Sequence, residues 1–242
     1  MTFDTTLPPP ITPDLALFLD FDGTLAPIQD DPASIYLSGR QQACIVSLSE
    51  TLDSALAIVS GRDIRDLSKR VPNSVWRAGS HGLEICAPGD AALHVPKAAP
   101  PGLESSLQAI TTSYPGSRLE VKGEVMAIHY RFAPREGASI QGEMANVLNA
   151  YPGYTLQSGK YVLEAKPAGA NKGAALDSFM GLSAFMGRVP VMVGDDTTDE
   201  DAMSVVAARG GWAIKVGEGE TGARYRLSEP DDVWRWLSKG TL

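Results

Sequence analysis

Several ingredients are scarce in this 242-residue sequence, and each scarcity excludes a class of protein. Two cysteines, Cys44 and Cys86, are too few for a disulfide framework, and they form neither a CxxC pair nor a Cys/His cluster of the kind that binds zinc. We therefore expect two reduced, buried thiols. No apolar run approaches the roughly 18 residues that a membrane-spanning helix needs. The first ten residues contain Asp4 and no basic residue, unlike a secretory signal, so we expect a cytoplasmic protein without a membrane partner.

Basic residues are also in the minority, because 21 Lys and Arg stand against 29 Asp and Glu, a formal net charge of −8. An acidic surface repels phosphate backbones, so nucleic acid is not an expected partner. Hydrophobic residues make up 43% of the chain and charged residues 21%. This composition is typical of a folded protein and excludes disordered, collagen-like and coiled-coil chains. We expect a monomer with one large domain or two small ones.

Apolar runs of strand length alternate with helix-like segments along most of the chain. The runs lie at 15–19, 55–59, 189–193 and 212–216. The helix-like segments lie at 41–52, 64–70, 173–180 and 200–209. Continuous apolar runs are typical of parallel strands that are buried on both faces. The alternation therefore predicts an α/β fold with a doubly wound, Rossmann-like core and a parallel sheet.

The middle of the chain has a different pattern. Two Pro/Gly/Ala-rich stretches, 95–102 and 165–170, have linker composition. Between them, alternation of apolar and polar residues over 118–131 predicts an antiparallel hairpin, followed by a helix over 137–150 and a second hairpin over 154–164 that turns at Ser158-Gly159. We therefore expect an inserted α+β cap domain at 100–170, and a discontinuous core made of 1–99 and 171–242.

Acidic residues gather where two of the predicted strands end. Asp20 and Asp22 follow the first apolar run, and Asp195 and Asp196 follow the third. The carboxyl ends of parallel strands form the binding edge of such sheets, so we expect these acids at one site. Two close carboxylates repel each other, and either share a proton or bind a cation. Their hard oxygen atoms suit Mg²⁺. For Asp20 and Asp22 alone, a structural turn is an equally good interpretation.

A run of acids continues to Asp201, and helix capping is the alternative explanation for it. Asp and Glu stabilise the first turn of a helix. Capping accounts for 199–201, whereas Asp195 and Asp196 lie earlier, at the end of the strand. The sequence therefore favours a functional role for the earlier pair.

Four segments resemble the motifs of the haloacid-dehalogenase superfamily of phosphatases. They are Asp20-Phe21-Asp22-Gly23-Thr24, Ser60-Gly61-Arg62, Lys172-Gly173 and the acidic run 194–201. Further segments resemble the trehalose-6-phosphate phosphatase family more narrowly: Gly79-Ser80-His81-Gly82-Leu83-Glu84, Glu120-Val121-Lys122, His129-Tyr130-Arg131, and Gly159-Lys160 with Glu164 and Pro167. Together these segments span most of the chain.

The resemblance implies Mg²⁺-dependent hydrolysis of trehalose 6-phosphate through an aspartyl-phosphate. Asp20 is the implied nucleophile and Asp22 the acid and base. The other implied catalytic residues are Ser60, Lys172, Asp196 and Asp199. The metal ligands would be Asp20, the backbone carbonyl of Asp22, and Asp195. The implied substrate-binding residues are Gly61, Arg62, His81 and Gly82 in the core, and Glu120, Lys122, Arg131, Lys160 and Glu164 in the cap.

Some alternatives remain open at this point. The mixed charges of the cap are also typical of a solvated, salt-bridged hairpin face. A lone histidine such as His81 is often structural. The substrate could be another sugar phosphate, or the chain could be a silent sugar-phosphate sensor. A sensor would be expected to lack Asp20, Asp22 or Lys172, and all three are present.

Overall fold

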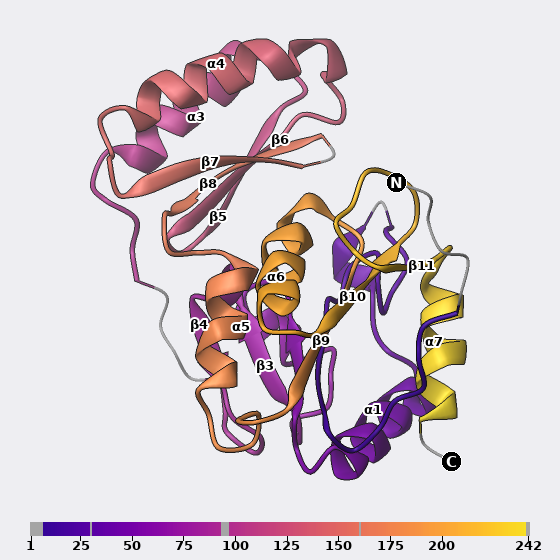
Figure 1. The fold of residues 1–242 in the computed structure, drawn as a ribbon. Coiled ribbons are helices and arrows are strands. Elements are labelled where there is room, and N and C mark those ends of the chain that lie inside the picture. Colours follow the sequence, from indigo (N-terminus) through magenta and orange to yellow (C-terminus); the bar gives the residue numbers. More distant parts are fainter. Residues whose placement is uncertain (1–6, 30, 93–96, 160, 241–242) are drawn as a thin grey trace. The chain divides into compact units, whose positions relative to one another are not determined.

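Two units make up the chain in the computed structural model, which describes residues 7–29, 31–92, 97–159 and 161–240. The first unit, called the core below, consists of Met1–Leu93 and Asn171–Leu242, and the second, called the cap, is His94–Ala170 (Figure 1). Each unit is described by itself.

The core contains a seven-stranded sheet with the strand order β11-β10-β9-β1-β2-β3-β4. All neighbouring strands are parallel except β3 and β4. The strands are β1 (Leu15–Leu19), β2 (Leu56–Val59), β3 (Trp76–Gly79), β4 (Glu84–Cys86), β9 (Val189–Gly194), β10 (Trp212–Val216) and β11 (Tyr225–Leu227). This mostly parallel sheet confirms the predicted α/β fold.

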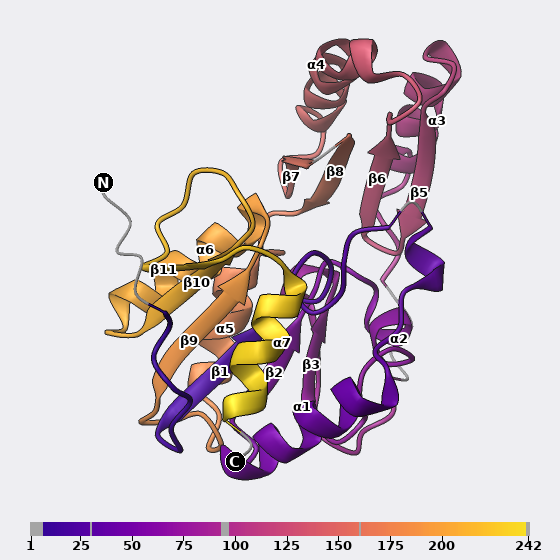
Figure 2. The same ribbon diagram turned by 90° about the vertical axis from the view of Figure 1, so that its right-hand side faces the viewer.

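Helices cover both faces of the core sheet. α5 (Lys172–Met180) and α6 (Thr197–Ala208) lie together on one face (Figure 1), and α1 (Gly39–Thr51) and α7 (Pro230–Lys239) lie on the other (Figure 2). The remaining helical segments of the core are α2 (Ile64–Leu67), η1 (Pro32–Ser34) and η2 (Ser80–Gly82). Because both faces are covered, all five residues of β1 are buried, which explains its uninterrupted apolar sequence.

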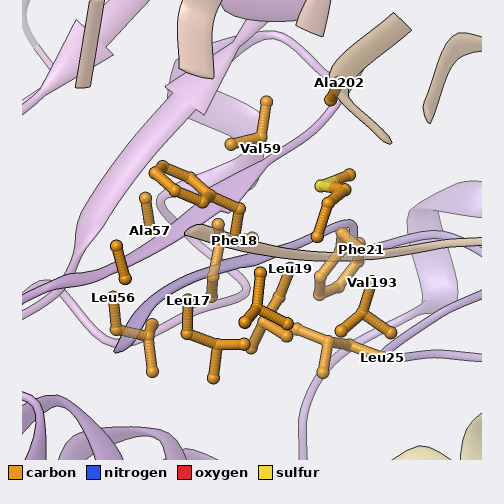
Figure 3. Packing of buried hydrophobic residues seen from close by; sticks show 14 of the residues in the cluster. Leu17, Phe18, Leu19, Phe21, Leu25, Leu56, Ala57, Val59, Val193 and Ala202 are labelled. Carbon is orange, nitrogen blue, oxygen red and sulfur yellow. The ribbon is translucent and has the colours of Figure 1, made fainter. Parts of the chain in front are cut away.

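Aromatic packing holds β1 at the centre of the core. The ring centroid of Phe18 lies 5.8 Å from that of Phe179 on α5 and 5.4 Å from that of Phe185. Phe21 and Leu25, in the loop that follows β1, are fully buried in the same cluster as the strand itself (Figure 3). Each such side chain stabilises the fold by roughly 1.5–3 kcal/mol. The buried anchors on both sides of Asp20 therefore fix where its carboxylate lies.

The cap is a four-stranded antiparallel sheet with two helices on one face. Its strand order is β5-β6-β8-β7. The elements are α3 (Leu103–Ser113), β5 (Arg118–Lys122), β6 (Val125–His129), η3 (Pro134–Glu136), α4 (Gly137–Leu148), β7 (Tyr154–Gly159) and β8 (Val162–Pro167). Side chains of Leu107, Met144, Met126 and Leu163 belong to one buried cluster, so α3 and α4 cover the face to which Met126 and Leu163 point.

The structure differs from the expectation at two places in the cap. β7 continues through Ser158 and Gly159, so the predicted turn at these residues is wrong. β8 runs through Pro167, so part of the expected linker at 165–170 is strand. The reason is tertiary: Ala165 pairs with both Met126 and Leu156 and is fully buried, although its sequence context has linker composition.

Two sequence expectations concern cysteines and membranes. Both cysteines are free thiols; Cys86 is buried, as expected, whereas Cys44 is only half-buried. Among the residues that the structure describes, no helix combines the length and apolar character needed to cross a membrane.

Candidate active site

The acids that follow β1 and β9 meet where the strand order of the core sheet reverses. From β1 the chain continues to β2 on one side, whereas β9 continues to β10 on the other. Leu19 pairs with Val193, and the Asp20 N–H donates to the Val193 carbonyl oxygen at 3.0 Å. Carboxylate oxygens of Asp20, Asp195 and Asp199 lie within 4.8 Å of one another. Such a switch point is the usual ligand-binding crevice of an open α/β sheet.

One ammonium group is shared between two of these carboxylates. Lys172, the first residue of α5, donates from Nζ to Asp20 Oδ1 at 2.6 Å and to Asp199 Oδ1 at 2.7 Å. The three residues are 3%, 4% and 0% exposed, respectively. Burial alone would lower the pKa of Lys172, but the charges of Asp199 and Asp20 outweigh it and raise this pKa. Lys172 is therefore a permanently charged, buried cation.

The cluster carries more negative than positive charge. Burial raises the pKa of Asp20 well above its ordinary value, and the charges of Asp199 and Asp195 add to this effect against the opposing charge of Lys172. Burial also raises the pKa of Asp195 to about 6, together with the Asp199 charge. Three carboxylates beside one ammonium therefore favour the uptake of a proton or a further cation.

A glycine lets the two acidic loops approach each other. Gly23 has a φ of 85°, and a Cβ at this position would lie 2.1 Å from Oδ2 of Asp195. Any side chain would therefore collide with the carboxylate, in a backbone conformation that L-residues rarely adopt. This is the structural reason for glycine after Asp22.

α6 begins at Thr197, inside the acidic run and three residues earlier than the sequence predicted. Asp196 is the N-cap residue, and its Oδ1 accepts the Thr197 N–H at 2.6 Å. Asp199 completes a capping box, and its Oδ2 accepts the N–H groups of Asp195 at 3.1 Å and of Asp196 at 3.0 Å. The view that capping leaves Asp196 unexplained is therefore wrong, because the helix starts at Thr197. Asp195 is the member of the run that capping does not explain.

Asp22 lies beside the cluster and pairs with an arginine. Nε and Nη2 of Arg62 donate to the two carboxylate oxygens of Asp22, both at 2.7 Å. Arg62 also donates to Asp66 at 2.8 Å, and Asp66 accepts from Arg70 at 2.7 Å. Sequence reasoning missed Asp66; the four-residue spacings to Arg62 and Arg70 were the available signal. The bidentate pair holds the Asp22 carboxylate in one orientation.

Ser60, Gly61 and His81 come together at the end of β2. Ser60 is 1% exposed, and its Oγ accepts the Arg62 N–H at 3.1 Å. The His81 N–H donates to the Ser60 carbonyl oxygen at 3.0 Å. A Cβ on Gly61 would lie 2.7 Å from Cε1 of His81, so only glycine lets the ring lie this close.

The η2 segment that carries His81 has an unusual backbone. Ser80 and His81 have φ values of 50° and 57°, in the left-handed region that non-glycine residues seldom occupy. Such strain costs of order 1–3 kcal/mol per residue and is common at functional loops. The adjacent Gly82 has a φ of 95°, and a Cβ there would lie 2.3 Å from the Ala175 Cβ of α5.

The cap residues share the sheet face that points away from α3 and α4, called the polar face below. The register pairs Glu120 with Ala127, Ala127 with Glu164, and Glu164 with Gln157. These four residues therefore form one row across all four strands. Glu120 and Glu164 are two strands apart, or about 10 Å, and between them lies only the methyl group of Ala127. Gln157 escaped sequence reasoning because the register alone reveals it.

Glu120 is held by two basic neighbours on the polar face. Its Oε2 lies 2.7 Å from Nε2 of His129 and 3.4 Å from Nζ of Lys122. The hydrogen bond with His129, followed by the Lys122 charge, outweighs burial and lowers the pKa of Glu120 to about 2. Glu120 and Lys122 share this face, as their spacing predicts. His129 belongs to one of the segments that resemble the family, but the sequence predicted no role for it.

The remaining two expected cap residues are Arg131 and Lys160. Arg131 lies two residues beyond the end of β6 and is exposed. Lys160 lies outside the residues that the structure describes. The expected core residues and the expected cap residues belong to different units of the chain.

The sequence also matches a known protein family. Residues 18–231 match the sequence profile of the trehalose-phosphatase family. The chain is 37% identical over 240 residues to a trehalose-6-phosphate phosphatase of Escherichia coli, covering 98% of this chain and 90% of that protein. It is 38% identical over 209 residues to a probable trehalose-phosphate phosphatase of Sinorhizobium fredii, covering 84% and 77%.

A solved structure shares the fold. The C-terminal domain of a C. albicans trehalose-6-phosphate phosphatase superposes with a TM-score of 0.82 at 22% identity, covering 95% of this chain and 92% of that chain. At this identity the likeness concerns the fold alone.

The environment of Glu120 generates a prediction about acid stability. A carboxyl whose pKa is lowered from 4.5 to about 2 contributes stability above pH 4.5 and loses it as the pH falls toward 2. Glu120→Gln should therefore lower the free energy of unfolding at pH 7, and the difference from wild type should shrink between pH 4.5 and pH 2. Urea unfolding at pH 7, 4 and 3 measures this difference.

Glu218→Gln is the control, because Glu218 is an exposed carboxylate in the loop after β10, outside any helix. It should change stability little at any of these pH values. A Glu120→Gln difference that stays constant from pH 7 to pH 3 would contradict the prediction.

Proposed function

The chain belongs to the trehalose-phosphatase family of phosphoric monoester hydrolases, and we propose that it hydrolyses trehalose 6-phosphate to trehalose and phosphate. The observation that carries this proposal is the buried cluster of Asp20, Lys172 and Asp199 at the carboxyl end of the central strand. The substrate comes from the Escherichia coli relative, whose name specifies trehalose 6-phosphate.

In the proposed reaction Asp20 is the nucleophile. Lys172 binds its Oδ1, and we assign the attack on phosphorus to Oδ2. The bond from phosphorus to the sugar oxygen breaks as the aspartyl-phosphate forms. Phosphoryl transfer needs mainly positioning and neutralisation of negative charge. Lys172 supplies a fixed positive charge, and the hydroxyl of Ser60, at the end of the neighbouring strand, donates to a phosphoryl oxygen.

Asp22 moves the protons. It gives a proton to the leaving sugar oxygen in the first step. In the second step it takes one from the water that attacks phosphorus, which releases phosphate and restores the Asp20 carboxylate. Arg62 donates to both oxygens of the Asp22 side chain. This bidentate pair holds the carboxyl group in one orientation for the proton transfers.

The proposed cofactor is Mg²⁺, held by Asp20, Asp195 and the backbone carbonyl of Asp22. The residues fit a divalent cation because their carboxylates lie close together and Lys172 neutralises only part of their negative charge. Asp199 is less suited as a ligand, since Lys172 and two backbone N–H groups occupy its oxygens. When bound, Mg²⁺ offsets the negative charge on the phosphoryl group. Mg²⁺ prefers hard oxygen ligands, which these carboxylate and carbonyl groups supply.

Sugar recognition is assigned to the polar face of the cap. Glu120 and Glu164 lie in one row, with Gln157 at its end, and ionised carboxylates bind sugar hydroxyls through charge-assisted hydrogen bonds. His129 and Lys122 hold Glu120 ionised and oriented. Lys160 and Arg131 remain proposed contributors on the strength of the motif resemblance.

The substrate is tested with a panel of sugar phosphates. Phosphate release from trehalose 6-phosphate should exceed release from sucrose, glucosylglycerol and glucose phosphates in kcat/KM by at least about a hundredfold. The glucosylglycerol and glucose phosphates carry fewer hydroxyls, and sucrose phosphate, of the same size as trehalose 6-phosphate, presents its hydroxyls in a different arrangement. Equal or faster release from another sugar phosphate would reassign the substrate while leaving the phosphatase reaction intact.

The nucleophile is tested by Asp20→Asn. The substitution removes the attacking carboxylate with little change in volume, and Lys172 keeps its ion pair with Asp199. Phosphate release should therefore fall by at least about a thousandfold while the thermal midpoint changes little. Circular dichroism melting checks the fold, and retention of a tenth of the wild-type rate would exclude Asp20 as the nucleophile.

The metal is tested by removal and replacement. EDTA should abolish phosphate release, and Mg²⁺ should restore it. Ca²⁺ should not restore it, because this larger ion accepts six to eight oxygens and tolerates bidentate carboxylates, which would occupy both oxygens of Asp20. Full activity in EDTA, or equal activity with Ca²⁺, is incompatible with the proposed site.

Sugar recognition is tested by Glu120→Ala and Glu164→Ala. Losing a hydrogen bond to a charged group costs roughly 1.5–3 kcal/mol, so kcat/KM for trehalose 6-phosphate should fall about tenfold to hundredfold. Hydrolysis of p-nitrophenyl phosphate, which carries no sugar, should be unchanged. Glu104→Ala, an exposed carboxylate on α3, should affect neither substrate. Equal loss of both substrates would mean a structural role, and loss of neither would mean a solvated charged face.

A further inference from the structure

A lysine interrupts the apolar strand β10, and neither the motifs nor the proposed reaction uses it. Lys215 is the fourth residue of the sequence Trp212-Ala213-Ile214-Lys215-Val216 and is only 4% exposed. Burying an ammonium group costs several kcal/mol unless it has partners. Its Nζ donates to the backbone carbonyl oxygen of Asp195. A buried charge that binds the backbone of a proposed metal ligand calls for a functional explanation.

The sheet register explains how the side chain reaches this carbonyl. Lys215 pairs with Gly194, the last residue of the neighbouring strand β9. Asp195 is the next residue after that strand ends, so its peptide group lies beside the lysine. The contact therefore follows from the position of the lysine at the carboxyl end of β10, next to the switch point.

Asp195 is held on both sides of its backbone. Its N–H donates to Oδ2 of Asp199 at 3.1 Å, and its carbonyl oxygen accepts from Lys215. With donor and acceptor both engaged, rotation of the Asp195 backbone would break two hydrogen bonds to charged groups. The two bonds therefore restrain the backbone from which the Asp195 carboxylate extends.

We propose that Lys215 is a positioning residue, which aims the Asp195 carboxylate into the cation site by holding its carbonyl oxygen. The proposal rests on the metal site of the proposed function. It assigns Lys215 no contact with substrate, because its ammonium is buried against the backbone. Partners of this kind, which orient metal ligands, contribute about tenfold to hundredfold to metal affinity.

Positioning and simple charge have opposite effects on cation binding. The positive charge of Lys215 repels a divalent cation, so its removal by itself should strengthen Mg²⁺ binding. Loss of the hydrogen bond frees the Asp195 peptide and should weaken Mg²⁺ binding. The sign of the change in affinity therefore decides between the two roles.

The experiment is calorimetric titration of Mg²⁺ into the substrate-free full chain. Lys215→Met keeps the length and apolar character of the side chain and removes the donor. Its Mg²⁺ affinity should fall about tenfold or more relative to wild type. kcat at saturating Mg²⁺ should stay within a few fold of the wild-type value.

Lys215→Arg keeps a charged donor and should recover most of the affinity. Lys69→Met, an exposed lysine of the same unit, is the matched control for loss of one charge and should bind as wild type does.

Unchanged or tighter Mg²⁺ binding by folded Lys215→Met would overturn the proposal. Thermal unfolding in EDTA establishes that the variant is folded. If it is not, Lys215→Gln, whose amide is one bond shorter than the lysine, replaces it with the same expected loss of affinity and the same contradicting result. Wild-type protein that binds no Mg²⁺ would reject the metal site and the role of Lys215 together. Wild-type binding with an unaffected variant would reject the role of Lys215 alone.

Discussion

Compensation of buried charge at the switch point is the constraint on which the rest of the core depends. Asp20 and Asp199 are almost completely buried, and both bind Lys172. None of these charges would be stable at this depth without an oppositely charged partner, because an isolated buried charge costs several kcal/mol. Lys172 and Asp20 stand 152 positions apart in the sequence, so the ion pairs exist only when β1, α5 and α6 are packed together.

The same balance of charge accounts for the surrounding loops. An excess of carboxylates favours the uptake of a proton or a cation, and contacts from the nearby loops hold those carboxylates in position. Gly23 makes room for Asp195, and Asp199 and Lys215 hold the Asp195 peptide from its two sides. The aromatic and aliphatic packing around β1 stabilises the fold against this repulsion.

The charged side chains of the cap are arranged differently from those of the core, because they lie on an open sheet face. Its hydrophobic cluster lies under α3 and α4, which leaves the other sheet face free to carry polar side chains. Antiparallel register then assembles a row from four strands, and the charges in it, such as Glu120 with His129 and Lys122, are paired across neighbouring strands or along one strand. Partial exposure and pairing keep Glu120 ionised, in contrast to Asp20 and Asp195 in the core, whose pKa values are raised by burial.

By itself, the sequence determined the class of fold, and it singled out Asp20, Lys172, Asp195 and Asp199, which the structure brings together. Buried parallel strands need long apolar runs, and such runs are visible without any structure. β3 escaped prediction because Arg77 interrupts it; its guanidinium is buried by bonds to the carbonyls of Ala87 and Asp90. Only the tertiary structure decided that Asp22 faces Arg62, that Asp196 caps α6, and which residues share the cap row with Glu120. Those pairings depend on register and on packing between distant segments, and local sequence patterns carry no information about either.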